Sequence, residues 1–207
     1  MNVLIIANGK LSNPGEYKDI VLQSHFIIAC DGGYSHIRSL GITTLDAAIG
    51  DFDSHFEKDI RAEKVISFPK EKDKTDIELA LEYAINKEAT AITILGGLGD
   101  RLDHSINLLY TISRFKEPAI KIIDEYNEVF VIQKNRNIIE GNIGQKISFI
   151  PMHIPIKHVE SEGLHYPLYT DWFNKGTLSI SNEFIQKEAI VTLEDAKFIV
   201  IKVLKNR

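Results

Sequence analysis

Aspartates recur in the segments that follow short apolar runs in the first half of this sequence. The acids placed in this way are Asp31, Asp51, Asp53, Asp73, Asp76 and Asp103. If the runs are neighbouring strands, their carboxylates meet at one place, which costs free energy unless a cation is present. Magnesium takes oxygen ligands and commonly shares such carboxylates with substrate phosphates. The pattern therefore predicts a site for a magnesium-bound phosphate chain.

Glycines and basic residues in the same loops fit that chemistry. Gly32 and Gly33 follow Asp31, and Gly97 and Gly99 follow the run Ala91–Leu95. Glycine allows backbone N–H groups to approach phosphate oxygens closely. Two basic side chains, Lys72 and Arg101, are placed to neutralise charge on such oxygens.

Simpler explanations exist for single residues and stay open at this point. Asp76 and Asp103 lie at or near expected helix starts, where acids often serve as caps or partners of the helix dipole. Asp51 and Asp53 also suit a solvated loop. His104 is a candidate base or a hydrogen-bonding residue at a helix start.

Nearly continuous apolar runs predict strands that are covered on both faces. The runs are Val3–Ala7, Phe26–Cys30, Ala47–Ile49, Val65–Phe68, Ala91–Leu95 and Ile120–Ile123. Amphipathic segments lie between them, one with Ile77, Leu81, Ala84 and Ile85 on a single face, and one with Leu102, Ile106 and Leu109. Capping boxes at Thr75–Glu78 and Ser54–Glu57 mark two helix starts. The alternation predicts a Rossmann-like parallel sheet, whose ligands bind beyond the carboxyl ends of the strands.

The second half of the chain has a different periodicity. Its runs are Asn137–Glu140, Lys146–Pro151, His158–Ser161, Thr177–Ile180, Ala189–Leu193 and Lys197–Val203. They are short, often alternate apolar with polar residues, and are separated by turn residues, which is typical of a small all-β sandwich. We therefore expect an α/β domain over residues 1–134 and a β-sandwich domain over residues 135–207.

Composition excludes several classes of protein. The 207 residues carry a net charge of −5 with no block of Lys and Arg, which disfavours nucleic acid as a partner. Cys30 is the single cysteine, so no disulfide can form within the chain. No apolar stretch is long enough to span a membrane, and a cytoplasmic location is expected. Neither a P-loop nor a G-x-G-x-x-G motif is present.

The ordered set of motifs resembles the thiamine pyrophosphokinase family. The motifs are Asp31-Gly32-Gly33, Gly50-Asp51-Phe52-Asp53-Ser54, Lys72-Asp73-Lys74-Thr75-Asp76, Arg101-Leu102-Asp103-His104, Gly163-Leu164-His165-Tyr166-Pro167-Leu168 and Ser181-Asn182-Glu183-Phe184. The resemblance implies transfer of the pyrophosphoryl group of ATP to the hydroxyethyl group of thiamine, which gives thiamine diphosphate and AMP. It also implies a homodimer, with each site between the α/β domain of one subunit and the β-sandwich of the other.

Site residues follow from the same resemblance. Asp51, Asp53 and Asp76 look like magnesium ligands, and with Arg101 and Asp103 they form the expected catalytic set. The expected nucleotide-binding residues are Asp31, Gly32, Gly33, Lys72, Asp73, Thr75, Gly97, Gly99 and His104. Asp103 or Asp53 is a candidate acceptor of the hydroxyl proton, and the sequence does not choose between them.

Thiamine is expected to contact the second domain. Carried over by position, Ser181 and Asn182 lie beside thiamine. Its cationic thiazolium is attracted to an aromatic face, for which Trp172, the single tryptophan, is the candidate. A partly buried sandwich residue is the alternative for Trp172, and the segment Tyr169–Lys175 matches the family poorly.

Two other functions use the same aspartates. A magnesium-dependent phosphohydrolase would use water as the nucleophile and would release phosphate without an acceptor alcohol. A non-catalytic nucleotide-binding module would bind ATP without turnover, and it would not need so many carboxylates.

Overall fold

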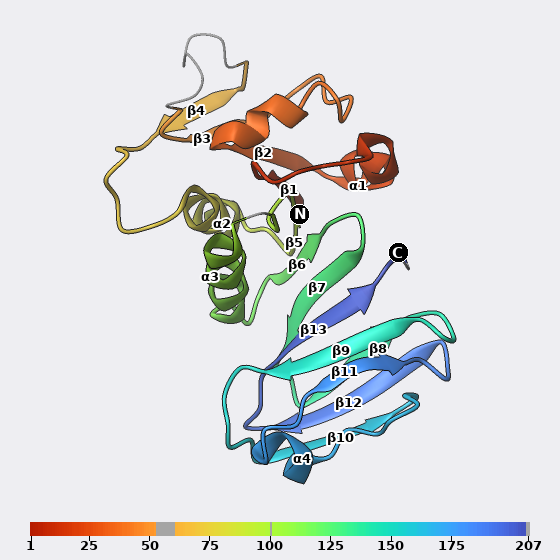
Figure 1. Cartoon of the computed structure of the whole chain (residues 1–207). Coiled ribbons are helices and arrows are strands. Elements are labelled where there is room, and N and C mark those ends of the chain that lie inside the picture. The colour runs from red at the N-terminus through yellow and green to blue at the C-terminus, as the bar shows by residue number, and fades with distance from the viewer. Residues whose placement is uncertain (53–60, 100, 206–207) are drawn as a thin grey trace. The chain divides into compact units, whose positions relative to one another are not determined.

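The computed structural model describes residues 1–52, 61–99 and 101–205 and divides the chain into two compact units, Met1–Glu125 and Tyr126–Arg207 (Figure 1). The sequence places the domain change after residue 134 instead. The difference concerns β7 (Asn127–Ile132), which pairs antiparallel with β13 (Phe198–Val203) and therefore belongs to the second unit. No change in composition marks the turn before β7.

The first unit is built on a parallel sheet, as the apolar runs predict. Its described strands are β1 (Asn2–Ile6), β2 (Phe26–Cys30), β3 (Ala47–Gly50), β4 (Lys64–Ser67), β5 (Ala91–Leu95) and β6 (Ala119–Ile123). Within this unit they lie in the order β6-β5-β1-β2-β3-β4, and each neighbouring pair is parallel. The chain thus adds strands on one side of β1 and then crosses to the other side with β5.

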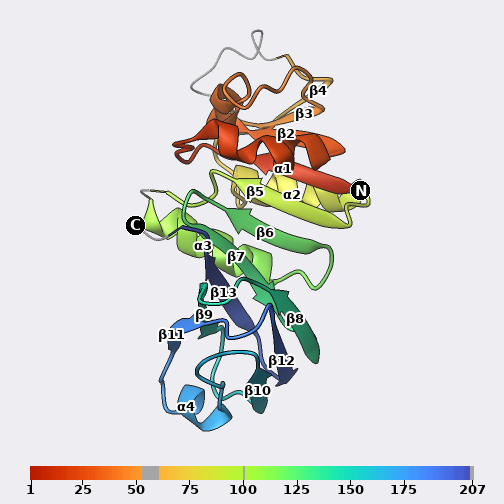
Figure 2. The same ribbon diagram turned by 90° about the vertical axis from the view of Figure 1, so that its right-hand side faces the viewer.

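Helices cover both faces of this sheet (Figures 1 and 2). The described helices of the unit are η1 (Pro14–Tyr17), α1 (Lys18–Gln23), η2 (Asp31–His36), α2 (Asp76–Asn86) and α3 (Leu102–Ser113). The two views place α1 on one face and α2 and α3 on the other. Helices η1, α1 and η2 were not predicted from the sequence. None of the described helices of the chain is both long and apolar enough to cross a bilayer.

The start of α2 is fixed by the predicted capping box. The Thr75 hydroxyl accepts from the Glu78 backbone N–H at 3.3 Å, and the Glu78 carboxylate accepts from the Thr75 N–H at 2.9 Å. The helix buries Leu81 and Ala84, two of the predicted face residues. The second predicted capping box, Ser54–Glu57, lies outside the described residues.

The predicted apolar face of α3 is not the face that packs in this unit. Leu102 is 69% exposed and Ile106 is 45% exposed, whereas Ser105 and Leu108 are buried. Leu109, the third residue of the predicted face, is half-buried, and the buried side of α3 is partly polar. An exposed apolar stripe remains along the helix, formed by Leu102, Ile106 and Tyr110, and is called the α3 stripe below.

The second unit is a β-sandwich, as predicted. Besides β7 and β13, its described strands are β8 (Arg136–Glu140), β9 (Lys146–Pro151), β10 (His158–Glu162), β11 (Ser179–Glu183) and β12 (Glu188–Glu194). Strands β11-β9-β13-β7 form one antiparallel layer and β10-β12-β8 form the other. Both layers contribute to one core, which includes Phe149, Val191 and Phe198. A short helix, α4 (Thr170–Asn174), adds Phe173 to that core.

Candidate active site

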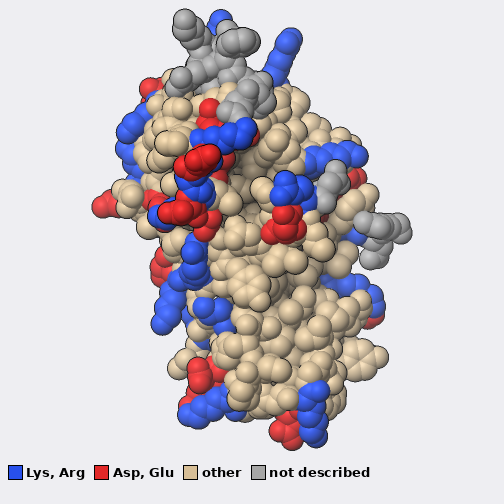
Figure 3. All heavy atoms as spheres, turned by 60° about the vertical axis from the view of Figure 1, so that its left-hand side comes forward, with Lys and Arg blue, Asp and Glu red and all other residues tan. Residues whose placement is uncertain are grey.

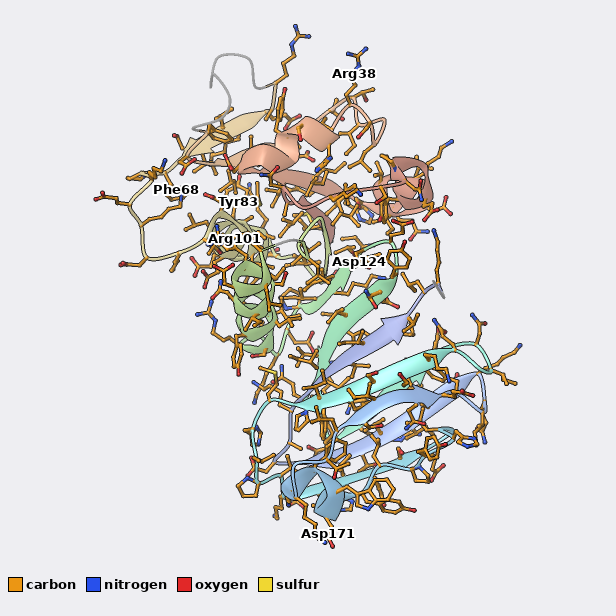
Figure 4. All side chains as sticks on the ribbon, viewed as in Figure 1. Arg38, Phe68, Tyr83, Arg101, Asp124 and Asp171 are labelled. Atoms are coloured by element: carbon orange, nitrogen blue, oxygen red, sulfur yellow. The ribbon has the colours of Figure 1, made fainter. Side chains whose placement is uncertain are left out.

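A cavity of about 780 Å³ lies in the first unit, beyond the carboxyl ends of the parallel strands. Strand order reverses between the neighbours β1 and β5, and such switch points are where open α/β sheets bind ligands. The loops after both strands line the cavity, as do residues from the loop before α2 and from α3. Figure 4 shows Arg101 at the N-terminal end of α3.

The loops after β1 and β5 are joined through their backbones. The Gly9 N–H donates to the Gly96 carbonyl at 2.8 Å, so the two loops touch without side chains between them. A Cβ on Gly9 would lie 2.4 Å from the Gly96 oxygen, and Gly96 itself has a φ of +66°. Glycine is therefore required at both positions, and the cavity floor is bare backbone.

Gly32 and Gly33 serve packing rather than lining the cavity. A Cβ on Gly33 would lie 2.1 Å from the Ile6 carbonyl oxygen, and one on Gly32 would lie 2.3 Å from the Asn8 side chain. Their lack of side chains lets η2 lie directly against the end of β1. This packing places Asp31, which precedes them, on the cavity wall.

Asp31, Asp51 and Asp76 come together in this cavity, as the strand-end rule predicts. Burial raises the pKa of the Asp76 carboxyl, the neighbouring Lys72 lowers it, and the charges of Asp31 and Asp51 raise it again. Oδ1 of Asp31 is buried and has no hydrogen-bond partner among the described residues, and the buried Oδ1 of Asp76 lies 2.9 Å from the Lys72 ammonium. The cluster thus brings buried carboxylate oxygens together at the cavity wall.

The geometry of the β3 loop supports the approach of Asp51 to this cluster. A Cβ on Gly50 would lie 3.0 Å from the Asp31 Cα, so this glycine lets β3 end close to Asp31. Phe52 follows with a φ of +52° and a buried ring, which anchors the loop. Asp53, the other expected ligand of this motif, lies outside the described residues.

Magnesium fits the carboxylates of this cavity. The buried carboxylate oxygens of Asp31 and Asp76 are the ligand type that the ion takes, and the Asp31 oxygen has no hydrogen-bond partner among the described residues. Within the described residues, no three His, Cys, Asp or Glu side chains are close enough to hold a metal ion by themselves. That is compatible with magnesium, which often binds one or two carboxylates and fills its shell with phosphate oxygens and water.

Arg101 and Asp103 form a two-point ion pair at the cavity edge. Arg101 Nε donates to Asp103 Oδ1 at 2.9 Å, and Nη2 donates to Oδ2 at 2.6 Å. The hydrogen bonds from Arg101 lower the pKa of Asp103 to about 2. Arg101 lines the cavity and Asp103 does not. The carboxylate therefore orients the guanidinium, and its low pKa makes it a weak proton acceptor.

Most of the expected nucleotide-binding residues line the same cavity. Besides Asp31, these are Lys72, Asp73, Thr75, Gly97, Gly99 and His104. On the face shown in Figure 3, basic and acidic side chains lie intermingled over the first unit. Basic side chains suit the phosphates of a ligand and acidic side chains suit its metal ion, so the mixture suits a metal-bound phosphate chain.

Several cavity residues were missed from the sequence. They are Asn8, Gly9, Lys10, Lys70, Lys74, Gly96, Ser105 and Asn107. The loop Asn8–Lys10 follows the first apolar run, so the rule that found the aspartates also applies to it. This loop carries no acidic residue, so the search for carboxylates did not identify it. Ser105 and Asn107 lie within a helix, and no sequence signal distinguishes them from other polar helix residues.

The expected thiamine-side residues lie in the second unit and differ in exposure. Trp172 is 46% exposed and packs edge-on against Tyr169, with ring centroids 4.8 Å apart. Ser181 is exposed and has a φ of +56°. Asn182 is buried, and its amide bonds to both the N–H and the carbonyl of Tyr166 at 3.0 and 2.7 Å. Asn182 thus ties the loop before α4 to β11.

Comparison with known proteins covers both units. Residues 17–123 match the family described as thiamin pyrophosphokinase, catalytic domain, and residues 131–197 match the thiamin pyrophosphokinase vitamin B1 binding domain. The thiamine pyrophosphokinase of Bacillus subtilis is 34% identical over 185 residues, which cover 85% of each chain. The chain belongs to the thiamine pyrophosphokinase family.

Solved structures of this family share the fold over the full length. Thiamin pyrophosphokinase from Geobacillus thermodenitrificans superposes with a TM-score of 0.81 at 25% identity, covering 100% of this chain and 99% of that one. The Bacillus subtilis thiamine pyrophosphokinase structure gives a TM-score of 0.79 at 27% identity, with 100% of both chains covered. The order of an α/β unit followed by a β-sandwich is therefore that of thiamine pyrophosphokinases.

The raised pKa of Asp76 predicts a stability effect in metal-free protein. The folded state binds the Asp76 proton more tightly than the unfolded state, so the ionised carboxylate lowers the free energy of unfolding once the pH exceeds its unfolded pKa. We expect Asp76→Asn to be more stable than wild type at neutral pH. The gain should shrink as the pH falls toward the ordinary aspartate pKa of about 3.9. Urea unfolding in the presence of EDTA at several pH values measures this. A less stable Asp76→Asn at neutral pH would show instead that the Lys72 ion pair outweighs burial.

Proposed function

We propose that this chain is a magnesium-dependent thiamine pyrophosphokinase that transfers the pyrophosphoryl group of ATP to the hydroxyethyl oxygen of thiamine. The observation that carries the proposal is the cavity at the switch point, where Asp31, Asp51 and Asp76 meet basic side chains over a floor of bare backbone. Family membership supplies the identity of the two substrates. The products are thiamine diphosphate and AMP.

Catalysis by such a site is mainly positioning and charge neutralisation. The thiamine oxygen forms a bond to the β-phosphorus of ATP, the bond from that phosphorus to the oxygen bridging it to the α-phosphorus breaks, and AMP leaves with that oxygen. Magnesium held by Asp51, Asp53 and Asp76 supplies charge neutralisation on the phosphate oxygens when bound. Arg101, oriented by Asp103, adds a fixed positive charge at the cavity edge.

The loops Asn8–Lys10 and Gly96–Gly99 line the cavity together with Lys70 and are placed to contact the rest of the phosphate chain. The hydroxyl proton of thiamine passes to a carboxylate. Of the two candidates, Asp103 is a weak base because Arg101 lowers its pKa to about 2, and Asp53 is the other candidate.

The second unit provides the thiamine contacts in this proposal. Trp172 presents an exposed ring that its edge-on contact with Tyr169 holds in place, and such a face attracts the cationic thiazolium. Ser181 contributes an exposed polar group on β11. Asn182 acts through the loop that it ties down, since both ends of its amide are engaged within the protein.

We further propose a homodimer whose sites combine the α/β unit of one subunit with the β-sandwich of its partner, in the cytoplasm. The α3 stripe supports this proposal. Leu102, Ile106 and Tyr110 recur every four residues on α3, and all are at least 45% exposed. The same helix begins at the cavity, so a partner that covers the stripe also reaches the site.

Turnover tests the reaction directly. With ATP and magnesium, we expect AMP to form only when thiamine is added, in amounts equal to thiamine diphosphate. Asp51→Asn should lower the rate by about 10²–10³-fold, because it removes a negative ligand at the charge centre of the transition state. Chromatography of the nucleotide and thiamine products measures both effects.

A charge-matched control is available on α1. Asp19 is exposed and does not line the cavity, so Asp19→Asn should retain the wild-type rate. Phosphate release that does not depend on thiamine would favour a hydrolase, and absence of any turnover would favour a binding module. Near wild-type activity in Asp51→Asn would contradict the metal assignment.

The dimer proposal predicts that a charge in the α3 stripe separates the subunits. Ile106→Lys would place an ammonium in the buried centre of the interface, where it has no partner, so we expect the mass in sedimentation equilibrium to fall from dimer to monomer. Leu22→Lys is the matched control, because Leu22 is a 71% exposed apolar residue on α1. A monomeric wild type, or an Ile106→Lys variant that stays dimeric, would refute this interface.

A further inference from the structure

Lys72 occupies an unusual position beside Asp76. Its Nζ lies 2.9 Å from Asp76 Oδ1, and the two side chains are only 15% and 24% exposed. Both atoms are buried, and within the described residues neither has a hydrogen-bond partner outside this pair. The two charges are therefore desolvated and depend on each other, which is costly unless further polar partners are supplied.

Lys74, two residues along the same loop, shows the ordinary arrangement. Its Nζ donates to both carboxylate oxygens of Glu82 at 2.7 and 2.8 Å, and the side chain is 48% exposed. Both lysines line the cavity. The loop thus places one lysine in a well-formed surface ion pair and the other in a buried, incomplete one among carboxylates.

The carboxylates around Lys72 explain why its ammonium lies beside Asp76. The Asp31 and Asp51 charges act on Asp76, and the buried Asp31 oxygen lacks a hydrogen-bond partner among the described residues. A single ammonium offsets only one of the three negative charges of Asp31, Asp51 and Asp76. A divalent cation with oxygen ligands would offset more of this charge.

We propose that the Lys72 ammonium takes the place of the metal ion: it pairs with Asp76 in the metal-free protein and is displaced when magnesium binds. The proposal rests on the proposed function. The released ammonium, on a flexible four-carbon stem inside the cavity, then serves as a phosphate contact. Lys72 thereby opposes magnesium binding by itself and favours the binding of magnesium together with a nucleotide.

Such a residue has a distinctive signature, because its removal changes two affinities in opposite directions. In Lys72→Met, magnesium alone no longer competes with an ammonium for Asp76. We expect its dissociation constant to fall by about tenfold, as for loss of a competing charged contact. Magnesium–ATP without thiamine loses a phosphate contact, and we expect its dissociation constant to rise by about tenfold. Removal of a purely structural lysine would not change these two dissociation constants in opposite directions.

Isothermal titration at pH 8 of Mg²⁺ alone, and of magnesium–ATP without thiamine, measures both constants. Lys74→Met is the matched control: it removes the same charge from the same loop, and its affinity for Mg²⁺ alone should stay within about twofold of wild type, because an exposed charge is well screened. Lys72→Gln, which keeps a polar side chain, replaces Lys72→Met if circular dichroism shows the latter to be unfolded.

If the dissociation constant for Mg²⁺ alone falls and that for magnesium–ATP rises, and if both changes occur only in the Lys72 variants, the proposed role of Lys72 is supported. Equal or weaker binding of Mg²⁺ alone in the Lys72 variants would overturn it, as would an equal gain in Lys74→Met. Thiamine-dependent AMP formation by the wild-type preparation is measured alongside. If AMP formation depends on thiamine but the two dissociation constants do not shift in opposite directions, only the proposed role of Lys72 is refuted. If thiamine-dependent AMP formation is absent, the proposed function fails as well.

Discussion

Repulsion among carboxylates that are held together at one edge of a parallel sheet is the constraint on which this structure depends. Asp31, Asp51 and Asp76 come from loops after different strands, and burial, together with the charges of Asp31 and Asp51, raises the pKa of the Asp76 carboxyl. A cation stabilises such a cluster with its carboxylates ionised. The described chain offers Lys72, whose buried ammonium lies 2.9 Å from Asp76. One ammonium does not balance three carboxylates, so the site suits an additional positive charge.

The rest of the α/β unit maintains this arrangement at the cost of conformational freedom. Gly9 and Gly96 allow two loops to touch through their backbones, and Gly33 allows η2 to lie against β1. The capping box at Thr75 fixes the start of α2 at Asp76. Beyond the end of β4, near Phe68 in Figure 4, the chain enters the loop that carries Lys72. These features position the charged side chains through backbone geometry, which is stiffer than a contact between side chains.

Much of this was predictable from the sequence, because burial on both faces leaves a continuous apolar run for each parallel strand. The fold class and the meeting of Asp31, Asp51 and Asp76 were predicted in this way, and the capping-box motif predicted the start of α2 after Thr75. Features that depend on tertiary packing were not. Leu102 and Ile106 have helical spacing but face outward, and periodicity alone cannot say what a stripe will cover. The saturated amide of Asn182 and the pairing of β7 with β13 also depend on contacts distant in sequence.

The central claim is that a divalent cation belongs at these carboxylates. A crystal structure with ATP and Mn²⁺, which shares the oxygen-ligand chemistry of Mg²⁺ and scatters anomalously, tests it most directly. We predict an anomalous peak within bonding distance of Asp51 and Asp76, with Lys72 moved away from Asp76 toward the phosphates. A metal bound only by phosphates, with Lys72 and Asp76 still paired, would contradict the account.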